Sequence, residues 1–171
     1  MQHFANKVEF DGFKFDSEKE KHFYDRFIKP SGKRVDVHPS YPVQDIFRLG
    51  GYKVRGINYA PDFVVYDERG EIAHVYDVKT SVDSAGVDSA ALLRFKLFER
   101  RYGKPVEVVV PRANDFKMTM FGFTTPHHIL DKHAKRDRQG RLKQTKNGNY
   151  VYRYYNVYND INYRIEDLVG R

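Results

Sequence analysis

The sequence predicts an α/β fold, and three observations support that prediction. Apolar residues make up 40% of the 171 residues, which is enough for a packed core in one domain. Two segments repeat apolar residues at helical spacing, one early and one late in the first 110 residues. Short β-branched and aromatic runs lie between and after them. After an opening hairpin the order is helix, strand, strand, strand, helix, strand, which is typical of helices layered on a sheet.

The N-terminal elements follow from short-range signals. Residues 8–15 predict a β-hairpin, because apolar and polar side chains alternate around an Asp-Gly pair. A helix is expected to begin at Ser17 and to end before Pro30. Its apolar face is made of Phe23, Tyr24, Phe27 and Ile28. The extended stretch 35–46 contains two prolines, which favour an edge strand or an irregular strand.

Two strands and a second helix should follow. The strands are expected at Tyr59–Tyr66 and Glu71–Lys79, joined by a polar turn. The helix should span residues 88–102 and stop at Gly103. Its apolar stripe consists of Ala91, Phe95, Phe98 and Tyr102. The β-branched run Val106–Val110 predicts a buried strand.

The last third of the chain predicts smaller elements. Residues 117–123 favour a strand, and Thr125-Pro126 predicts the start of a short helix that ends near His133. Gly140–Thr145 and Tyr150–Tyr158 flank an Asn-Gly pair and therefore predict a second hairpin.

The composition excludes several classes of function. The chain contains no cysteine, so disulfides, thiolate zinc sites and thiol catalysis are ruled out. A formal net charge of +7 and a pI near 9.4 favour nucleic acid or another anionic surface as partner. No apolar run approaches the roughly 18 residues of a membrane span, and the N-terminus has no signal-peptide centre. We therefore expect a cytoplasmic protein that does not bind membranes.

The positive charge is concentrated in the last third of the chain. Residues 1–110 carry 18 Lys and Arg against 17 Asp and Glu, whereas residues 111–171 carry 12 against 6. We expect a core domain at 1–110 and a basic, tyrosine-rich extension at 111–171 that packs on it and binds nucleic acid. The densest cations are Lys132, Lys135, Arg136, Arg138, Arg141, Lys143 and Lys146. Six tyrosines follow between Tyr150 and Tyr163, and they could stack on unpaired bases or cover the core.

Two acids and a lysine are expected to meet at one end of the hairpin formed by residues 59–79. Asp62 begins its outgoing strand, whereas Asp77 and Lys79 end its returning strand, two residues apart and thus on one face. Close carboxylates repel each other unless a cation lies between them, and oxygen ligands suit Mg²⁺ or Mn²⁺. The alternative is ordinary, because Pro-Asp is common at turns and Asp-Val-Lys fits a solvent-facing strand.

These residues resemble the signature of the PD-(D/E)XK nuclease superfamily, which reads here as Pro61-Asp62, a hairpin, then Asp77-Val78-Lys79. The resemblance covers roughly residues 5–110 and implies a restriction-endonuclease-like αβββαβ core with a mixed central sheet. To this core the basic extension adds a β-hairpin. Three further blocks make the chain similar to a group of small phage and prophage proteins in that superfamily, namely residues 15–20, 55–63 and 95–98.

The resemblance implies a metal-dependent endonuclease that hydrolyses phosphodiester bonds in DNA. Asp62 and Asp77 would be ligands of Mg²⁺ or Mn²⁺, and the backbone carbonyl of Val78 is a further candidate ligand. Lys79 would orient the attacking water and stabilise charge. Glu20 matches a first-helix acid that resolvase-like members use at the metal site. Asp77 stands where Glu is commoner, and its shorter side chain should leave metal binding intact.

Glu20 also fits a purely structural role. The pattern Ser17-x-x-Glu20 is a capping box, in which Glu20 satisfies the N-terminus of the helix. However, Glu20 shares a helical face with Tyr24 and Phe27, and a carboxylate aimed at a core face needs a cation or a hydrogen-bond partner. Both roles stay open at this point.

Two further cations are candidates for phosphate contacts. Arg55 precedes the hairpin and could clamp a phosphate, and Lys96 lies beside the apolar stripe of the second helix. For both, a solvated surface charge is the alternative. His74 is expected to pack or to face outward, and His127 and His128 to pack at a helix end.

The sequence therefore predicts a DNA endonuclease in phage DNA replication, recombination or packaging, with branched or single-stranded DNA favoured as substrate. The alternatives are a non-catalytic DNA-binding or assembly protein that keeps the fold, and an RNA nuclease. The resemblance also implies a homodimer, because resolvase-like members often pair to cut two strands. For a phage-encoded chain, the expected location is the host cytoplasm.

Overall fold

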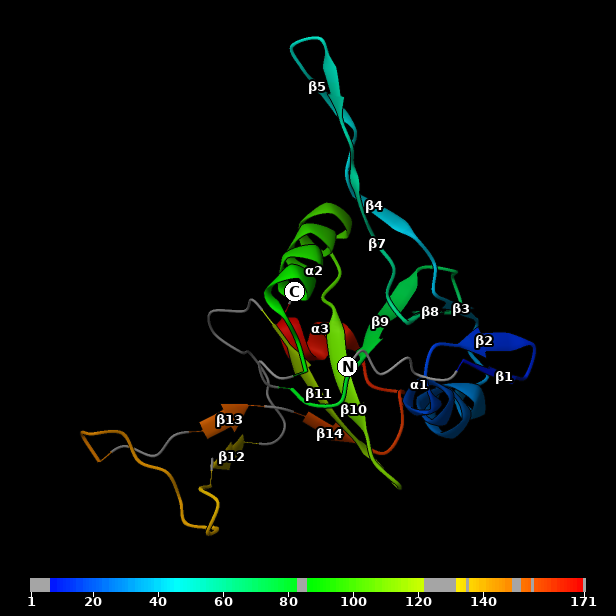
Figure 1. Cartoon of the computed structure of the whole chain (residues 1–171). Helices are drawn as coiled ribbons and strands as arrows, with labels where there is room; N and C mark the ends of the chain where they lie inside the picture. The colour runs from blue at the N-terminus through cyan, green and yellow to red at the C-terminus, as the bar shows by residue number, and fades with distance from the viewer. Residues whose placement is uncertain are drawn as a thin grey trace.

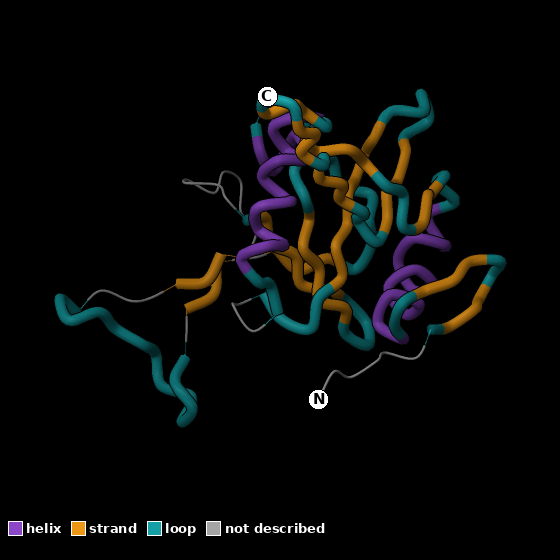
Figure 2. Tube along the Cα trace, turned by 45° about the horizontal axis from the view of Figure 1, so that its top comes forward, coloured by secondary structure: helices purple, strands orange, loops and turns teal. Residues whose placement is uncertain are grey.

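The computed structural model describes residues 7–82, 86–121, 132–134, 136–148, 152–154 and 156–170. A mixed sheet lies at its centre, with helices on both faces (Figures 1 and 2). β9 and β10 run parallel, and every other neighbouring pair in this sheet is antiparallel. The predicted α/β class is therefore confirmed. In spatial order the strands are β14(Asn156–Tyr158), β11(Phe116–Met120), β10(Glu107–Pro111), β9(Ile72–Val78), β8(Phe63–Tyr66) and β3(Val35–Val37).

Two apolar clusters hold the helices against the sheet. In the first cluster, α1(Glu18–Phe23), its π-helical continuation η1(Tyr24–Ile28) and α3(Ile165–Val169) pack on one face. In the second cluster, α2(Ser89–Tyr102) packs on the opposite face. Side chains alternate between the two faces along each strand, so that Phe63 of β8 belongs to the first cluster and its neighbour in β8 to the second. The central strands are consequently buried on both sides.

Both predicted helices form with the expected ends. The side chain of Ser17 caps α1, and that of Asp88 caps α2, each by accepting a backbone N–H of the first turn. The 3₁₀ turn η2(Lys29–Ser31) closes the first helical run at Gly32, and Gly103 closes α2. Both glycines have a φ of 66°, a left-handed conformation that glycine adopts without the steric cost of a Cβ.

The opening hairpin is confirmed as β1(Val8–Phe10) and β2(Phe13–Phe15). Its two turn residues both have positive φ, as a two-residue turn of this kind requires. The hairpin packs on the first helical run through Phe10 and Phe13, whose rings meet the ring of Tyr24 edge-on. This contact fixes the N-terminal hairpin beside the start of η1.

Between β3 and β8 the chain forms two small antiparallel pairs outside the central sheet. β4(Tyr41–Gln44) pairs with β7(Ile57–Tyr59), and β5(Phe47–Leu49) pairs with β6(Tyr52–Val54). The irregular stretch predicted at 35–46 is thus confirmed as the edge strand β3 followed by β4. Sequence analysis misses the β5–β6 hairpin, which projects from the body of the molecule (Figure 1).

The single strand predicted at Tyr59–Tyr66 is wrong, because the chain changes sheets inside it. β7 ends at Tyr59 in the small pair with β4, and β8 begins at Phe63 in the central sheet. Pro61 lies between them and has no backbone N–H for a ladder. The break places Asp62 immediately before β8. The strands expected at Glu71–Lys79 and Val106–Val110 are confirmed as β9 and β10.

In the last third, one predicted hairpin is wrong, and one predicted helix is contradicted at its end. The helix expected from Thr125 lies outside the described residues until its end, where Lys132–Ala134 forms the strand β12 instead. The hairpin expected around Asn147-Gly148 does not form, because β13(Tyr152–Tyr154) pairs with β12. At the start of the expected first strand, the Asp137 carboxylate accepts the backbone N–H of Gln139 and of Arg141, which forms a turn there. The strand expected at 117–123 is confirmed as β11, with its last two residues outside the described part.

The C-terminal residues complete the core rather than hanging from it. Tyr158, Ile161, Ile165 and Leu168 all belong to the first apolar cluster. A buried polar network adds to this packing, centred on the fully buried carboxylate of Glu107. The members that surround it are His74, the backbone N–H of Val75, Tyr76 and Tyr163.

Replacing Tyr163 by Phe should destabilise the fold, because the Tyr163 hydroxyl donates to the fully buried carboxylate of Glu107. We expect the free energy of unfolding to fall by about 1–3 kcal/mol. Urea denaturation of both proteins measures the change. Tyr52→Phe is the matched control, because Tyr52 is 82% exposed and its hydroxyl should contribute nothing. Equal losses in the two variants would contradict the role of the network.

Glu99→Gln should change how stability depends on pH. Burial raises the pKa of Glu99 to about 7, against the opposing effects of its hydrogen bond from the Val106 N–H and the charge of Lys96. The folded chain then binds more protons than the unfolded chain between the ordinary pKa of 4.5 and about 7, so stability falls as pH rises through this window. Melting temperatures at pH 5 and pH 8 should differ less in Glu99→Gln than in the wild type. An unchanged difference would show that Glu99 does not titrate in this range.

Candidate active site

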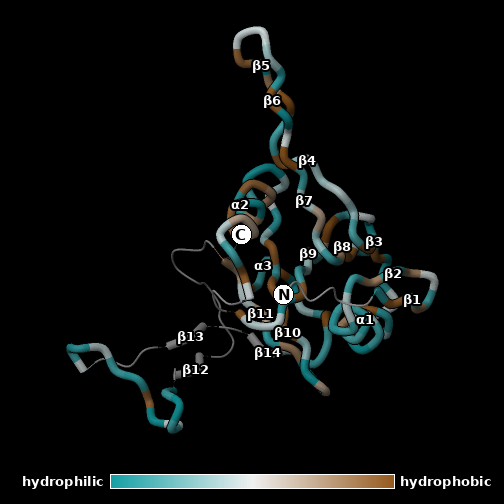
Figure 3. Tube along the Cα trace, in the orientation of Figure 1, coloured by the Kyte–Doolittle hydropathy of each residue, from teal (hydrophilic) through white to brown (hydrophobic). Residues whose placement is uncertain are grey.

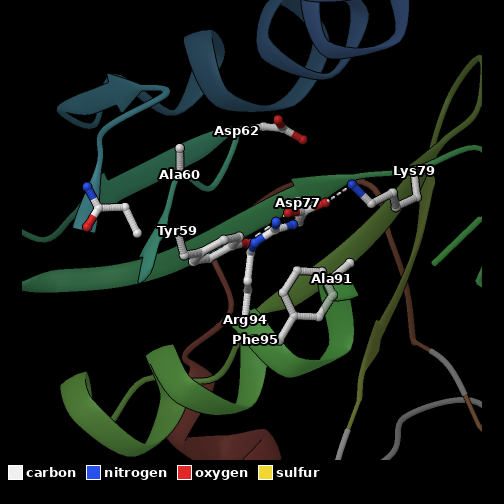
Figure 4. Close-up of a pocket in the computed structure, with 9 residues that line it drawn as sticks. Tyr59, Ala60, Asp62, Asp77, Lys79, Ala91, Arg94 and Phe95 are labelled. Atoms are coloured by element: carbon white, nitrogen blue, oxygen red, sulfur yellow. Dashed lines mark hydrogen bonds and ion pairs between the residues drawn. The ribbon is translucent and has the colours of Figure 1, made fainter. Parts of the chain in front are cut away.

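Asp62, Asp77 and Lys79 line one pocket beside α2 (Figure 4). The pairing of β8 with β9 brings them together, since the register Phe63↔Tyr76 places the residue before β8 beside the end of β9. Asp77 and Lys79 form an ion pair, as expected for residues two apart on a strand. The pocket has a volume of about 310 Å³. Its other lining residues are Asn58, Tyr59, Ala60, Ala91, Arg94 and Phe95.

Asp77 is a buried carboxylate, only 4% exposed. Its Oδ2 accepts a hydrogen bond of 2.8 Å from the Tyr59 hydroxyl, whose pKa burial and the charge of Asp77 raise well above its usual range. The tyrosine therefore stays a donor at neutral pH. Among the described residues, Asp77 Oδ1 accepts no directed hydrogen bond and has Lys79 as its partner in an ion pair. That oxygen has unused acceptor capacity inside the pocket.

Asp62 lies in an environment that disfavours its charged form. Burial raises the pKa of its carboxyl well above the usual range, and the charges of Asp77 and Glu20 raise it further. The backbone N–H of Val78, which donates to Asp62 Oδ2 at 2.6 Å, and the charge of Lys79 oppose this rise. Three carboxyl groups therefore crowd one region with a single ammonium group among them.

Lys79 keeps its positive charge at neutral pH. Burial alone would lower the pKa of its ammonium group, but the charge of Asp77, its partner in the ion pair, and the charge of Asp62 raise it above the usual value. Its backbone N–H donates to the Val109 carbonyl at 2.9 Å, which ties it to β10. The side chain is 28% exposed, so its ammonium group can reach a ligand in the pocket.

Glu20 performs the predicted capping and also faces the site. The hydroxyl of Ser17 donates to Glu20 Oε1 at 3.0 Å, and the Asp16 N–H donates to Oε2 at 2.9 Å. The same Oε2 lies 3.0 Å from His38 Nε2. The two roles weighed for Glu20 are thus compatible, because the capping box aims this carboxylate at the other acids.

His38 links Glu20 with Asp62. One nitrogen of His38, one oxygen of Glu20 and one oxygen of Asp62 all lie within 4.8 Å of one another, an arrangement that could hold a metal ion. The backbone N–H of His38 donates to the Asp62 carbonyl at 3.0 Å, which fixes the histidine at this place. Its φ of 51° is uncommon for a residue with a side chain and indicates local strain.

Sequence reasoning missed three residues of this site: His38, Tyr59 and Arg94. His38 precedes a proline in a stretch assigned only to an irregular strand, and no sequence signal marks its contact with the helix. The sequence predicts Tyr59 only as part of a strand, although its position three residues before Asp62 could have indicated that it lies in the site. Arg94 reaches the pocket from α2, two residues before Lys96, which is the candidate cation that the sequence offers on this helix.

The other predicted cations lie elsewhere. Arg55 and Lys96 are exposed and do not line this pocket. In the basic stretch, Lys132 lies in β12 and Lys135 outside the described residues, whereas Arg141 is paired with Asp137 at 2.8 Å. The remaining cations are exposed, namely Arg136, Arg138, Lys143 and Lys146.

Of the histidines considered from sequence, His74 is buried against Glu107, with 3.0 Å between its Nδ1 and a carboxylate oxygen. It belongs to the structural network described above. His127 and His128 lie outside the described residues. None of the helices in the described ranges is long and apolar enough to cross a membrane.

The chain was compared with known proteins by sequence and by structure. No curated protein matches it, and no solved structure does. A family model described as "Protein of unknown function (DUF1064)" matches residues 1–118. The matched part contains every residue of the pocket together with Glu20 and His38. Because the match spans more than half of the chain, the protein belongs to the DUF1064 family.

Proposed function

We propose that this protein is a metal-dependent DNA endonuclease of the PD-(D/E)XK superfamily. The observation that carries the proposal is the convergence of Asp62, Asp77 and Lys79 in one pocket. The order of elements supports it, since α1, β3, β8, β9, α2 and β10 follow one another as in a restriction-endonuclease-like core. Resemblance and geometry therefore point to the same three side chains.

The residues present fit a divalent cation. Asp77 Oδ1 is buried without a directed hydrogen bond among the described residues, and Asp62 is crowded by neighbouring carboxylates. Asp62 and Asp77 would hold Mg²⁺ or Mn²⁺, with the Val78 carbonyl and Glu20 as further candidate ligands. When bound, such an ion polarises a phosphate oxygen and lowers the pKa of water. The imidazole of His38 adds a nitrogen donor, which extends the set beyond the oxygen ligands expected from sequence.

The chain's own residues would supply the remaining functions. The charged ammonium of Lys79 can hold the attacking water or neutralise a phosphate oxygen as negative charge develops. The Tyr59 hydroxyl holds Asp77 in place through Oδ2 and leaves Oδ1 facing the pocket. Arg94 extends from α2 into the same pocket and can pair with a phosphate (Figure 4).

DNA fits this site better than a small phosphorylated substrate does. The pocket is open to one side of a basic protein, and the exposed cations of residues 136–148 offer phosphate contacts beyond it. Each phosphate contact releases counterions, so the affinity should fall steeply with salt. Five of the nine lining residues are polar or charged, whereas small-molecule pockets are lined mainly by apolar side chains.

Asp77→Ala and Lys79→Ala should each reduce DNA cleavage by about 100-fold or more, because each removes a group that acts on developing charge. Cleavage is measured on labelled linear, single-stranded and four-way DNA with Mg²⁺ or Mn²⁺, and on matched RNA. Glu68→Ala, an exposed acid in the β8–β9 turn, is the control and should cleave normally. Circular dichroism checks that all variants fold.

Three results would overturn this proposal. Cleavage that persists in both variants would show that the pocket is not the active site. DNA binding by the wild type and both variants without any cleavage would favour a non-catalytic DNA-binding protein. Cleavage of RNA alone would replace DNA as the substrate.

His38→Gln should weaken Mn²⁺ binding by about tenfold or more and Mg²⁺ binding much less, because an imidazole nitrogen favours the softer ion. Isothermal titration calorimetry with each metal measures both affinities. His22→Gln is the matched control, since His22 contacts the Arg112 carbonyl away from the acids. Identical Mn²⁺ affinities in His38→Gln and the wild type would exclude His38 as a ligand.

A further inference from the structure

The β5–β6 hairpin carries an unusual set of exposed side chains. Phe47, Leu49 and Tyr52 are 44%, 69% and 82% exposed, and Ile46 at its base is 66% exposed. These are four of the six large apolar residues described as exposed. The hairpin projects from the body of the molecule, and hydrophobic positions recur along its two strands (Figure 3). A monomeric soluble protein rarely presents such a group without a partner.

The two faces of the hairpin differ in character. The register pairs Phe47 with Val54 and Leu49 with Tyr52, so these four side chains share one face. Arg48 lies opposite Lys53 on the other face. One side of the ribbon is therefore apolar and aromatic, and the other is cationic.

Within the described ranges, no acidic side chain forms an ion pair with the cationic face. Arg48 and Lys53 are direct cross-strand neighbours, an arrangement of like charges that destabilises a strand pair. Arg55 follows, and the stretch 46–56 contains no acidic residue. The nearest acid in sequence, Asp45, is already paired with Arg101 at 2.9 Å. A polyanion would relieve this repulsion, and a basic protein surface would not.

The base of the hairpin is rigidly held. A Cβ at Gly56 would lie 2.5 Å from the Gln44 carbonyl oxygen. The backbones of residues 44 and 56 therefore approach each other as closely as only glycine permits. The Tyr102 hydroxyl donates to the Pro42 carbonyl at 2.9 Å and joins this base to the end of α2. The hairpin thus points in a direction set by the body of the protein.

The hairpin is also continuous with the wall of the pocket. β6 leads directly into β7, whose Asn58 and Tyr59 line the pocket, and Asp62 follows three residues later. Tyr59 follows Tyr52 by seven positions, so the two residues are at most about 23 Å apart along the strands. This distance corresponds to about seven base pairs along a DNA duplex. A duplex segment with its phosphate in the pocket can therefore reach the hairpin.

We propose that the β5–β6 hairpin is a wedge that recognises branch points in DNA. A two-stranded ribbon fits a DNA groove, and apolar side chains that enter between bases favour sites where stacking is already broken. Arg48 and Lys53 contact the phosphates, while Leu49 and Tyr52 cover the exposed face of an unstacked base pair. This proposal rests on the proposed function and assigns branched DNA as its substrate class.

The test measures binding with EDTA in place of metal, so that cleavage does not enter. A four-way junction and a linear duplex of equal length are compared, with 2-aminopurine at the branch to report unstacking. Leu49→Ser/Tyr52→Ser should lose about tenfold of the preference for the junction, together with the fluorescence increase. Leu93→Ser, an exposed leucine of α2, is the matched control and should bind as the wild type does.

Arg48→Ala/Lys53→Ala should instead weaken binding to both DNAs. The slope of log affinity against log salt should fall by about 2, because roughly 0.9 counterion is released for each phosphate contact. Arg69→Ala/Arg100→Ala removes two exposed cations elsewhere and is the matched control. All variants change exposed residues, and circular dichroism confirms their folding.

Three results would overturn the wedge. In the first, the wild type binds the junction no more tightly than the duplex. In the second, Leu49→Ser/Tyr52→Ser keeps the wild-type preference for the junction. In the third, that variant changes from dimer to monomer while its DNA binding stays intact. The last would identify a second copy of the chain as the occupant. Hairpin-dependent junction binding without any cleavage would support the wedge and reject the nuclease. Normal cleavage with hairpin-independent binding would reject the wedge alone.

Discussion

Electrostatic repulsion among three carboxyl groups is the constraint on which the rest of the site depends. Glu20, Asp62 and Asp77 come from three different elements, and their mutual charge raises the pKa of Asp62 after burial has already raised it. Lys79 and the Val78 N–H offset only part of this cost. Packing on both faces of the sheet must hold the acids together. The aromatic contacts of Phe23 and Phe63 beneath them supply part of that packing.

The fold places each acid by a different local device. Glu20 is aimed by a capping box, Asp62 by a proline break that ends one sheet and starts another, and Asp77 by the pleat of β9. None of these devices is specific to catalysis. Their coincidence at one edge of the sheet is what distinguishes the site, because each would be unremarkable alone.

Sequence reasoning succeeds here where the signal is local. The Asp-Gly turn, the Ser17 and Asp88 caps and the spacing of Asp77 and Lys79 each depend on a few neighbouring residues, and all appear in the structure as expected. It fails where pairing depends on distant partners. The partner of β13 is β12 rather than the nearer residues 140–145, and no local pattern reveals that choice.

In the site, too, residues with local sequence signals could be predicted and residues placed by distant contacts could not. Asp62, Asp77 and Lys79 belong to one hairpin and could be predicted together. His38 joins them through a left-handed backbone conformation and a contact with α1, neither of which leaves a trace in residue type. Gly50-Gly51 between two alternating runs was a readable signal for the β5–β6 hairpin, but the runs are only three residues long.

The basic segment 136–148 lies between two strands that are neighbours in the same sheet, β11 and β14. The strands before and after the segment are therefore held by the sheet, whatever residues the segment itself contains. The terminal helix α3, which follows β14, packs in the first apolar cluster. Such a segment is modular. It can be lengthened or shortened while the strands on either side keep their pairing, so that its composition can change without loss of the apolar core.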